Sequence, residues 1–242
     1  MGRVLLAMRR ALRAARLGTR FWGTSRFCLP KTILIGTRTV CLTAPPERGL
    51  AYDFINVLLD DEYGLEQKSG GSSSVLDIGA NIGLFSLWAR RNFPQAVIHA
   101  YEPNPRLIEF TRSNLKQAGV RLFDEGVGSD LGFAVMEDRQ ESRLGRVKLG
   151  AQAGIRITPL AEAIQRMGGS VDLLKLDCEG AEWDILRDEC SFARVRFIRM
   201  EYHLVENRSL DDLKGCAKNL GFQIDRLVPN HGFGIAWLSR RL

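Results

Sequence analysis

The chain has 242 residues, of which 45% are hydrophobic and 26% charged, so it is long enough for one domain with a sizeable core. No segment approaches the roughly 18 consecutive apolar residues of a membrane-spanning helix. The five cysteines are scattered and form no C-x-x-C pair. These features argue against a disulfide framework and a cysteine-based zinc site, and they favour a reducing, cytoplasmic compartment.

The net charge of +6 comes from the first part of the chain. Residues 1–46 carry nine basic residues and no acidic one, which leaves 25 basic residues against 28 acidic ones in the remainder. The body of the protein is therefore mildly acidic, and its charge gives no reason to expect a nucleic-acid partner.

Residues 1–30 are predicted to form a basic, amphipathic helical extension. On a 3.6-residue period the apolar side chains fall within one arc and the arginines in the adjacent arc: Val4, Leu5, Met8, Leu12 and Ala15 against Arg9, Arg13, Arg16 and Arg20. Three interpretations stay open. The apolar face packs on the domain, or the helix lies on the anionic inner face of a membrane, or the segment is a transit peptide.

Residues 31–73 are predicted to form a cap segment ahead of the main domain. Two β-rich runs at 32–35 and 39–42 flank a turn at Gly36, and a helical pattern follows at 52–60. Residues 68–74 are rich in serine and glycine, which is typical of a flexible spacer. We therefore place the main domain at residues 74–242.

Strands and helices alternate through the main domain. Strands are expected at 75–78, 96–101, 120–126, 171–176 and 195–202, helices at 83–91, 105–117, 161–167, 181–188 and 210–220, and a closing hairpin at 222–227 and 234–239. This alternation predicts a Rossmann-like, doubly wound α/β fold, with a mainly parallel sheet covered by helices on both faces. Polar pieces at 131–158 interrupt it and predict a small β-hairpin insert, where substrate contacts often lie.

The turn after the first core strand is the most informative segment. Asp77-Ile78-Gly79-Ala80-Asn81-Ile82-Gly83 joins a buried strand to a helix. Glycine lets a ligand approach the backbone closely, and asparagine tolerates the left-handed conformation best among the other residues. The spacing matches neither the G-x-G-x-x-G of dinucleotide-binding enzymes nor a P-loop.

Two carboxylates flank this turn and point to the chemistry of its ligand. Asp77 would repel a pyrophosphate but suits a ligand with a positive ammonium group, such as S-adenosylmethionine. Glu102 ends the next strand, where a carboxylate can accept hydrogen bonds from both ribose hydroxyls. The alternatives are a glycine turn with no ligand and a Glu102 that only caps the following helix.

A second polar segment follows the strand at 171–176. Lys175 and Asp177 share one face of the strand, and Asp177 is expected to face the same cleft as the cofactor. Glu179 and Glu182 come at the start of a helix, where carboxylates are favoured without any chemistry. A structural ion pair between Lys175 and Asp177 is the alternative for those two residues.

His203 is the candidate general base. It leaves the next strand at the carboxyl edge of the sheet, and histidine titrates near neutrality; a histidine with a purely structural role is the alternative. A divalent metal held by Asp177, Glu179 and Glu182 is a further possibility, although no His-carboxylate cluster requires it.

Together these segments resemble the FkbM-type methyltransferases, and the block Lys175-Leu176-Asp177-Cys178-Glu179-Gly180-Ala181-Glu182 narrows the resemblance to that family. It also covers Glu62-Tyr63-Gly64, Tyr101-Glu102-Pro103-Asn104-Pro105 and Glu201-Tyr202-His203. The resemblance implies a seven-stranded sheet with one antiparallel strand near the end. It also implies methyl transfer from S-adenosylmethionine to a hydroxyl of a sugar, glycolipid, polysaccharide or secondary metabolite.

The candidate site residues then divide into two sets. The cofactor-binding set is Asp77, Gly79, Asn81, Gly83, Glu102, Asn104 and Asp124, and the catalytic set is His203, Asp177, Lys175 and Glu179. The third strand departs from the family pattern at Gly126-Val127-Gly128, so Asp124 and Glu125 are weak candidates for adenine contacts. The rival functions are a nicotinamide-dependent oxidoreductase, a nucleic-acid methyltransferase and a non-catalytic binding protein.

Overall fold

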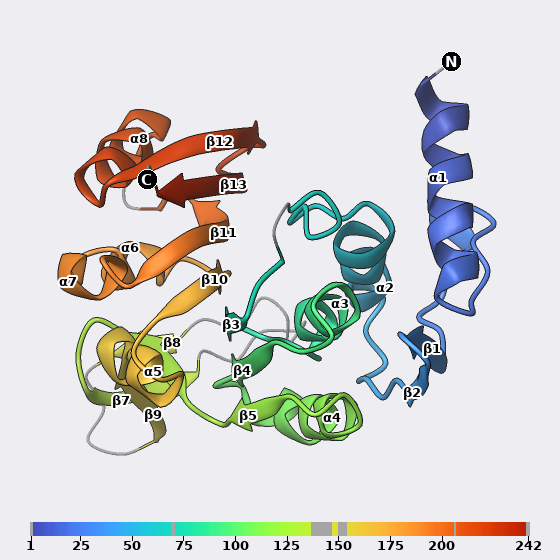
Figure 1. Cartoon of the computed structure of the whole chain (residues 1–242), viewed down its shortest axis with the longest axis horizontal. Helices are drawn as coiled ribbons and strands as arrows, with labels where there is room; N and C mark the ends of the chain where they lie inside the picture. The colour runs from blue at the N-terminus through green and yellow to red at the C-terminus, as the bar shows by residue number, and fades with distance from the viewer. Residues whose placement is uncertain (1, 69–70, 137–146, 150–153, 206, 241–242) are drawn as a thin grey trace.

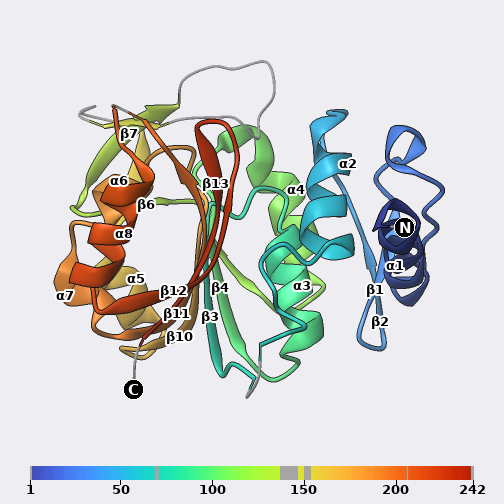
Figure 2. The same ribbon diagram turned by 90° about the horizontal axis from the view of Figure 1, so that it is seen from above.

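The computed structural model describes residues 2–68, 71–136, 147–149, 154–205 and 207–240. A seven-stranded sheet forms the centre of the molecule and helices cover both of its faces (Figures 1 and 2). The Rossmann-like, doubly wound α/β arrangement predicted from the alternation of elements is confirmed.

The central sheet has the strand order β12-β13-β11-β10-β3-β4-β5. All neighbouring pairs from β11 to β5 are parallel, and β13 runs antiparallel to both β11 and β12, so the single antiparallel strand is confirmed. The strands are β3 Ser74–Ile78, β4 Val97–Tyr101, β5 Arg121–Phe123, β10 Val171–Leu176, β11 Val195–His203, β12 Phe222–Pro229 and β13 Phe233–Arg240. From β3 the chain adds β4 and β5 on one side and then β10 and β11 on the other, so the strand order reverses between β3 and β10. Ligands bind at this point in folds of this class.

The helices divide between the two faces (Figure 2). One face carries α2 Gly49–Phe54, the π-helical segment η2 Ile55–Leu59, α3 Leu84–Asn92 and α4 Pro105–Lys116. The other carries α5 Leu160–Arg166, α6 Glu182–Ile185, α7 Glu189–Phe192 and α8 Leu210–Asn219. Each face has its own cluster of buried apolar residues. The sheet is therefore buried on both sides, as near-continuous apolar strands require.

Local sequence signals set several helix ends. The side chain of Asn104 accepts a hydrogen bond from the Arg106 N–H, and Pro105 occupies the first helical position of α4. Ser209 and Asp212 form a reciprocal capping box at the start of α8. The predicted helix at 181–188 is present only as the shorter α6, and a separate short helix, α7, follows it, capped by the Asp188 side chain, which accepts a hydrogen bond from the Ser191 N–H.

The cap segment packs on the helical face that carries α3. It contains the hairpin of β1 Thr32–Ile35 and β2 Arg38–Cys41, followed by α2 and η2. Phe54 of α2 and Trp88 of α3 belong to one apolar core. Residues 69 and 70 of the expected spacer lie outside the described residues, but Ser73 is fixed to the sheet by two hydrogen bonds to the Asp172 carboxylate.

The predicted first helix is present as α1 Gly2–Arg16, with the 3₁₀ turn η1 Thr24–Arg26 after it, but α1 faces the opposite way from the packing interpretation. Its apolar arc points to solvent, whereas Arg13 and Ala14 are buried. Arg10 pairs with Asp60, and Arg13 pairs with Glu66 and donates to the Leu59 carbonyl. Carboxylates on the cap segment therefore hold the arginine side of the helix inward.

The insert is larger than the predicted hairpin. It is a four-stranded sheet with the order β6-β9-β7-β8, built from β6 Gly126–Gly128, β7 Gly132–Met136, β8 Val147–Leu149 and β9 Ile155–Pro159. Residues 137–146 and 150–153 of this region lie outside the described part. The predicted third strand at 120–126 is wrong in its second half. The charged pair Asp124-Glu125 ends β5, and the chain then joins the small sheet as β6.

None of the helices within the described ranges combines the length and the apolar character that crossing a bilayer requires.

Two glycines with similar backbone angles provide a test of the first turn. Gly79 has φ +78°, and a Cβ there would lie 1.8 Å from the backbone oxygen of Asp177, whereas Gly119 has φ +64° with nothing within 4 Å. Both Gly→Ala changes incur left-handed strain of about 1–2 kcal/mol, but only Gly79→Ala also forces β3 and β10 apart. We expect Gly79→Ala to lower the free energy of unfolding, measured by urea denaturation, by about 1–3 kcal/mol more than Gly119→Ala. Equal destabilisation by the two changes would contradict this account.

Candidate active site

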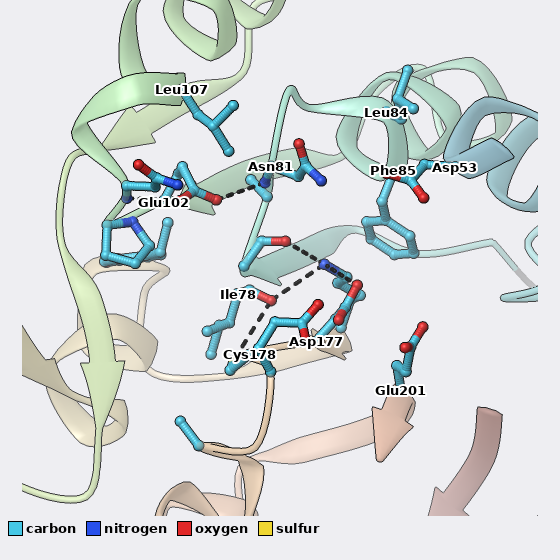
Figure 3. Close-up of a pocket in the computed structure, with 18 of the residues that line it drawn as sticks. Asp53, Ile78, Asn81, Leu84, Phe85, Glu102, Leu107, Asp177, Cys178 and Glu201 are labelled. Atoms are coloured by element: carbon cyan, nitrogen blue, oxygen red, sulfur yellow. Dashed lines mark hydrogen bonds and ion pairs between the residues drawn. The ribbon is translucent and has the colours of Figure 1, made fainter. Parts of the chain in front are cut away.

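A cavity opens at the carboxyl ends of β3, β4, β10 and β11 (Figure 3). Its floor and walls come from the turns that follow these strands, and one side is closed by α2 and η2 of the cap segment. Apolar side chains line part of it: Ile78, Leu84, Phe85, Leu107, Val127, Met136 and Phe233. The remaining wall is polar and mostly acidic, so the cavity has an apolar and an acidic side.

The glycine turn of β3 forms one edge of the cavity. Asn81 has φ +53°, the left-handed conformation expected from the sequence, and Gly79 and Gly83 also have positive φ. Gly79 and Asn81 line the cavity. Gly83 does not, and a Cβ there would meet Leu115 of α4 at 2.6 Å. Gly83 is therefore needed for helix packing, and Gly79 for the close approach of two strand ends.

Glu102 lies at the end of β4 and lines the same cavity (Figure 3). One carboxylate oxygen accepts the Asn81 N–H at 2.7 Å, and the other accepts the Asn104 N–H at 2.8 Å. Burial raises the pKa of Glu102 to about 7. Two donors orient the group while each of its oxygens keeps a further lone pair. Asn104 itself caps α4, so Glu102 is not the helix cap.

Lys175 lies between two aspartates at the cavity floor. Its ammonium is 3.4 Å from Asp77 and 3.4 Å from Asp177, and it donates to the Gly79 carbonyl. Burial lowers the pKa of Lys175, but the two carboxylates more than offset this, and the net pKa is raised. Asp77 is fully buried, accepts a hydrogen bond from the Ser86 hydroxyl at 2.6 Å, and does not line the cavity.

Asp177 faces the cavity, as expected from its strand face (Figure 3). One of its oxygens accepts a hydrogen bond of 3.1 Å from the hydroxyl of Tyr63, a buried residue of the cap segment. Burial and the charge of Asp177 hold the pKa of Tyr63 well above its ordinary value. Tyr63 therefore acts as a hydrogen-bond donor to Asp177 at neutral pH.

Five carboxyl side chains form what we call the acidic wall: Asp53, Glu62, Asp177, Glu179 and Glu201. Burial, followed by repulsion from neighbouring carboxylates, raises the pKa of Glu62 to about 8 and that of Glu201 to about 9. Like charges that share a poorly solvated site cannot all ionise at neutral pH. The acidic wall therefore holds exchangeable protons in the range where enzymes work.

His203 lies behind the acidic wall rather than in the cavity lining. Its Nε2 is 3.5 Å from Glu179 and 3.6 Å from Glu201, and its Nδ1 is 3.4 Å from Glu182. Burial lowers the pKa of His203, but Glu182 and Glu179 outweigh this and raise it. A ligand in the cavity would therefore be separated from His203 by Glu201 or Glu179.

Glu182 closes the turn after β10. Its carboxylate accepts the Cys178 N–H at 2.6 Å and the Gly180 N–H at 3.0 Å, which is the role of a helix-start acid. Glu179, with φ +55°, instead lines the cavity. Among the described residues, no group of His, Cys, Asp and Glu side chains is arranged to hold a metal ion.

Asp124 and Glu125 separate at the end of β5. Asp124 pairs with Arg112 at 2.9 Å on the exposed side of α4 and is not part of the cavity lining. Glu125 lines the cavity and is held by Arg166 at 2.8 Å and by the Thr158 hydroxyl. Of the two weak adenine candidates, the structure brings only Glu125 to the cavity.

Several lining residues had no role assigned from the sequence. Asp53 and Asn56 come from α2 and η2, which carry no motif. Glu62, Tyr63 and Glu201 do fall within the segments that resemble the family. The fold brings these segments, which are far apart in the sequence, together at the cavity, and this contact cannot be read from the sequence.

Comparisons with known proteins agree with this architecture. Residues 77–235, more than half of the chain, match the family described as the methyltransferase FkbM domain. Methyltransferase sdnD of Sordaria araneosa is 27% identical over 168 residues, covering 52% of this chain and 65% of that protein. The AMB antimetabolite synthetase AmbE of Pseudomonas aeruginosa is 27% identical over 208 residues, covering 67% of this chain and 10% of that protein.

A third relative is covered more fully. The 31-O-demethyl-FK506 methyltransferase FkbM of Streptomyces tacrolimicus is 24% identical over 201 residues, covering 67% of this chain and 76% of the relative. The chain spans less than two thirds of sdnD and a tenth of the synthetase. The extent of the family match and the site geometry lead to one conclusion: this chain belongs to the FkbM methyltransferase family.

Proposed function

We propose that the chain binds S-adenosylmethionine in the cavity and transfers its methyl group to a hydroxyl oxygen of a sugar, glycolipid, polysaccharide or secondary metabolite. The observation that carries the proposal is Glu102, a buried carboxylate held by two backbone N–H groups beside the glycine turn. Its remaining lone pairs suit a ligand that presents neighbouring hydroxyls, as a ribose does. The name of the Streptomyces relative, a 31-O-demethyl-FK506 methyltransferase, supports an oxygen as the acceptor atom.

The other residues of the cavity fit the rest of this cofactor. The backbone of Gly79 and Asn81 lies at the edge of the cavity, where the turn approaches the end of β10, and can contact the cofactor there. Glu125 and the apolar residues near it offer a partly apolar surface for a base. The acidic wall suits a positively charged sulfonium and ammonium. When bound, the cofactor would supply an electrophilic methyl group.

The chain's own residues supply alignment and a proton acceptor. In-line displacement requires positioning more than covalent catalysis, and Lys175 and Tyr63 fix Asp177 between them. An alcohol must lose its proton as it is methylated. Glu201 faces the cavity with His203 3.6 Å behind it, and we assign proton acceptance to this pair in the form with Glu201 ionised, which its raised pKa of about 9 favours at alkaline pH.

A nucleic-acid acceptor suits the cavity less well. Four carboxyl groups of the acidic wall line the cavity: Glu62, Asp177, Glu179 and Glu201. Such a lining offers a polyanionic phosphate backbone no electrostatic attraction, and each of its members that is ionised repels the phosphates. A neutral or cationic hydroxylated acceptor is not repelled.

The first test is cofactor binding by calorimetric titration. S-adenosylmethionine is expected to bind, and Glu102→Ala is expected to weaken binding at least ~tenfold, because hydrogen bonds to a charged group are lost. Glu109→Ala is the matched control, since that side chain is 86% exposed on α4. Tight binding of NADH without binding of S-adenosylmethionine would overturn the proposal.

The second test uses the raised pKa of Glu102. The ionised carboxylate is the better acceptor, and its population falls as the pH drops through about 7. Affinity for S-adenosylmethionine should therefore fall roughly tenfold from about pH 8 to about pH 6, with little change above pH 8. Glu102→Gln cannot ionise and should lose this part of the dependence. An identical pH profile in wild type and Glu102→Gln would show that another group controls binding.

The third test concerns the proton acceptor. His203→Ala should lower turnover with a hydroxylated acceptor by roughly 10²-fold, while the Kd for S-adenosylmethionine changes less than about twofold. S-adenosylhomocysteine release from a panel of hydroxylated acceptors measures turnover. His231→Ala, at an exposed turn, is the control. Unchanged turnover in His203→Ala would remove His203 from the mechanism.

A further inference from the structure

The outer face of α1 carries an apolar stripe that no part of the described chain covers. Val4, Leu5, Met8 and Leu12 are 55–66% exposed, and their spacing places them on one side of the helix. We call these four residues the α1 stripe. Exposed hydrophobic residues that are scattered singly need no explanation, but a contiguous stripe marks an interaction surface. The helix lies at the outer edge of the molecule in both views (Figures 1 and 2).

Ion pairs fix the direction in which the stripe points. Arg10 binds both oxygens of Asp60, at 2.8 and 2.6 Å, and Arg13 binds Glu66 at 3.0 and 2.5 Å. Ala14 and Leu17 on the same side are completely buried. At 100° per residue this inner side lies opposite the α1 stripe. Rotating the stripe inward would leave carboxylates of the cap segment without their partners, so the stripe stays outward.

The surroundings of the stripe are strongly basic. Five further basic residues between positions 9 and 31 are exposed: Arg9, Arg16, Arg20, Arg26 and Lys31. The first acidic residue of the chain is Glu47. Trp22, just beyond α1, is 80% exposed, and tryptophan favours the boundary between water and lipid.

We propose that the α1 stripe docks on an anionic lipid bilayer, with its side chains inserted at the interface and the exposed basic residues of 9–31 near the lipid phosphates. Aliphatic side chains flanked by arginine are the pattern of interfacial helices. A second copy of this chain is a poorer occupant, because two such basic segments would repel each other across a symmetric interface. A nucleic acid offers no apolar partner for four aliphatic side chains.

The test is co-sedimentation of the full chain with phosphatidylcholine vesicles containing about one third phosphatidylglycerol, and with pure phosphatidylcholine vesicles. The wild type should pellet with the anionic vesicles and much less with the neutral ones. Leu5→Glu/Leu12→Glu should reduce the partition coefficient at least ~tenfold. Both side chains are exposed, so the melting temperature should stay unchanged.

Val97→Glu/Leu131→Glu is the matched control, since it adds the same charge at two exposed apolar positions away from α1. It should pellet like the wild type. Equal pelleting of the α1 double variant and the wild type would overturn the proposal. So would a wild type that does not pellet but forms a dimer, by light scattering, that Leu5→Glu/Leu12→Glu dissociates. S-adenosylmethionine binding plays no part in this readout, so failure here leaves the proposed activity untouched.

Discussion

The site depends on one buried ammonium group. Lys175 on β10 lies between Asp77 at the end of β3 and Asp177 just after β10, and it also holds the Gly79 carbonyl. Without that positive charge, two aspartates would face each other in a poorly solvated space, which is unfavourable unless one of them is neutral. The same contact joins the ends of two neighbouring strands. The shape of the glycine turn and the position of the Asp177 carboxylate therefore have a common origin.

The cavity around this ion pair is lined by more carboxyl groups than the single positive charge of Lys175 can balance. Glu62 comes from the cap segment and Glu201 from β11, far apart in the sequence, and both have pKa values raised by burial and by repulsion from neighbouring carboxylates such as Asp177. Such groups change protonation with small changes in their surroundings, which is typical of sites that move protons. In the function proposed above, the β3–β4 side would bind the nucleoside and the acidic wall would transfer the proton.

The sequence was informative wherever a residue's role depends on its own strand or turn. The central sheet, the left-handed Asn81 and the placement of Glu102 and Asp177 follow from local patterns of this kind. It failed where the outcome depends on partners distant in the chain. The amphipathic pattern of α1 left an inward apolar face as one of three interpretations, and the pairing of Arg10 with Asp60 and of Arg13 with Glu66 turns that face outward. Asp124 and Glu125 are adjacent in sequence, yet Arg112 and Arg166 draw them to different places. Tyr63 reaches Asp177 across 114 positions, a contact that no local pattern records.

The cap segment carries one carboxylate that faces α1 and another that faces the cavity, so it connects these two parts of the molecule electrostatically. Asp60 faces α1 and is neutralised by Arg10, while Glu62, two residues later, faces the cavity. The charge of Asp60 is one of the influences that raise the pKa of Glu62. Any event that draws Arg10 away from Asp60 would expose Glu62 to the full negative potential of its neighbour and increase its affinity for a proton. Through Arg10, the outermost helix would thus act electrostatically on the protonation of Glu62 in the cavity, with no change in the backbone.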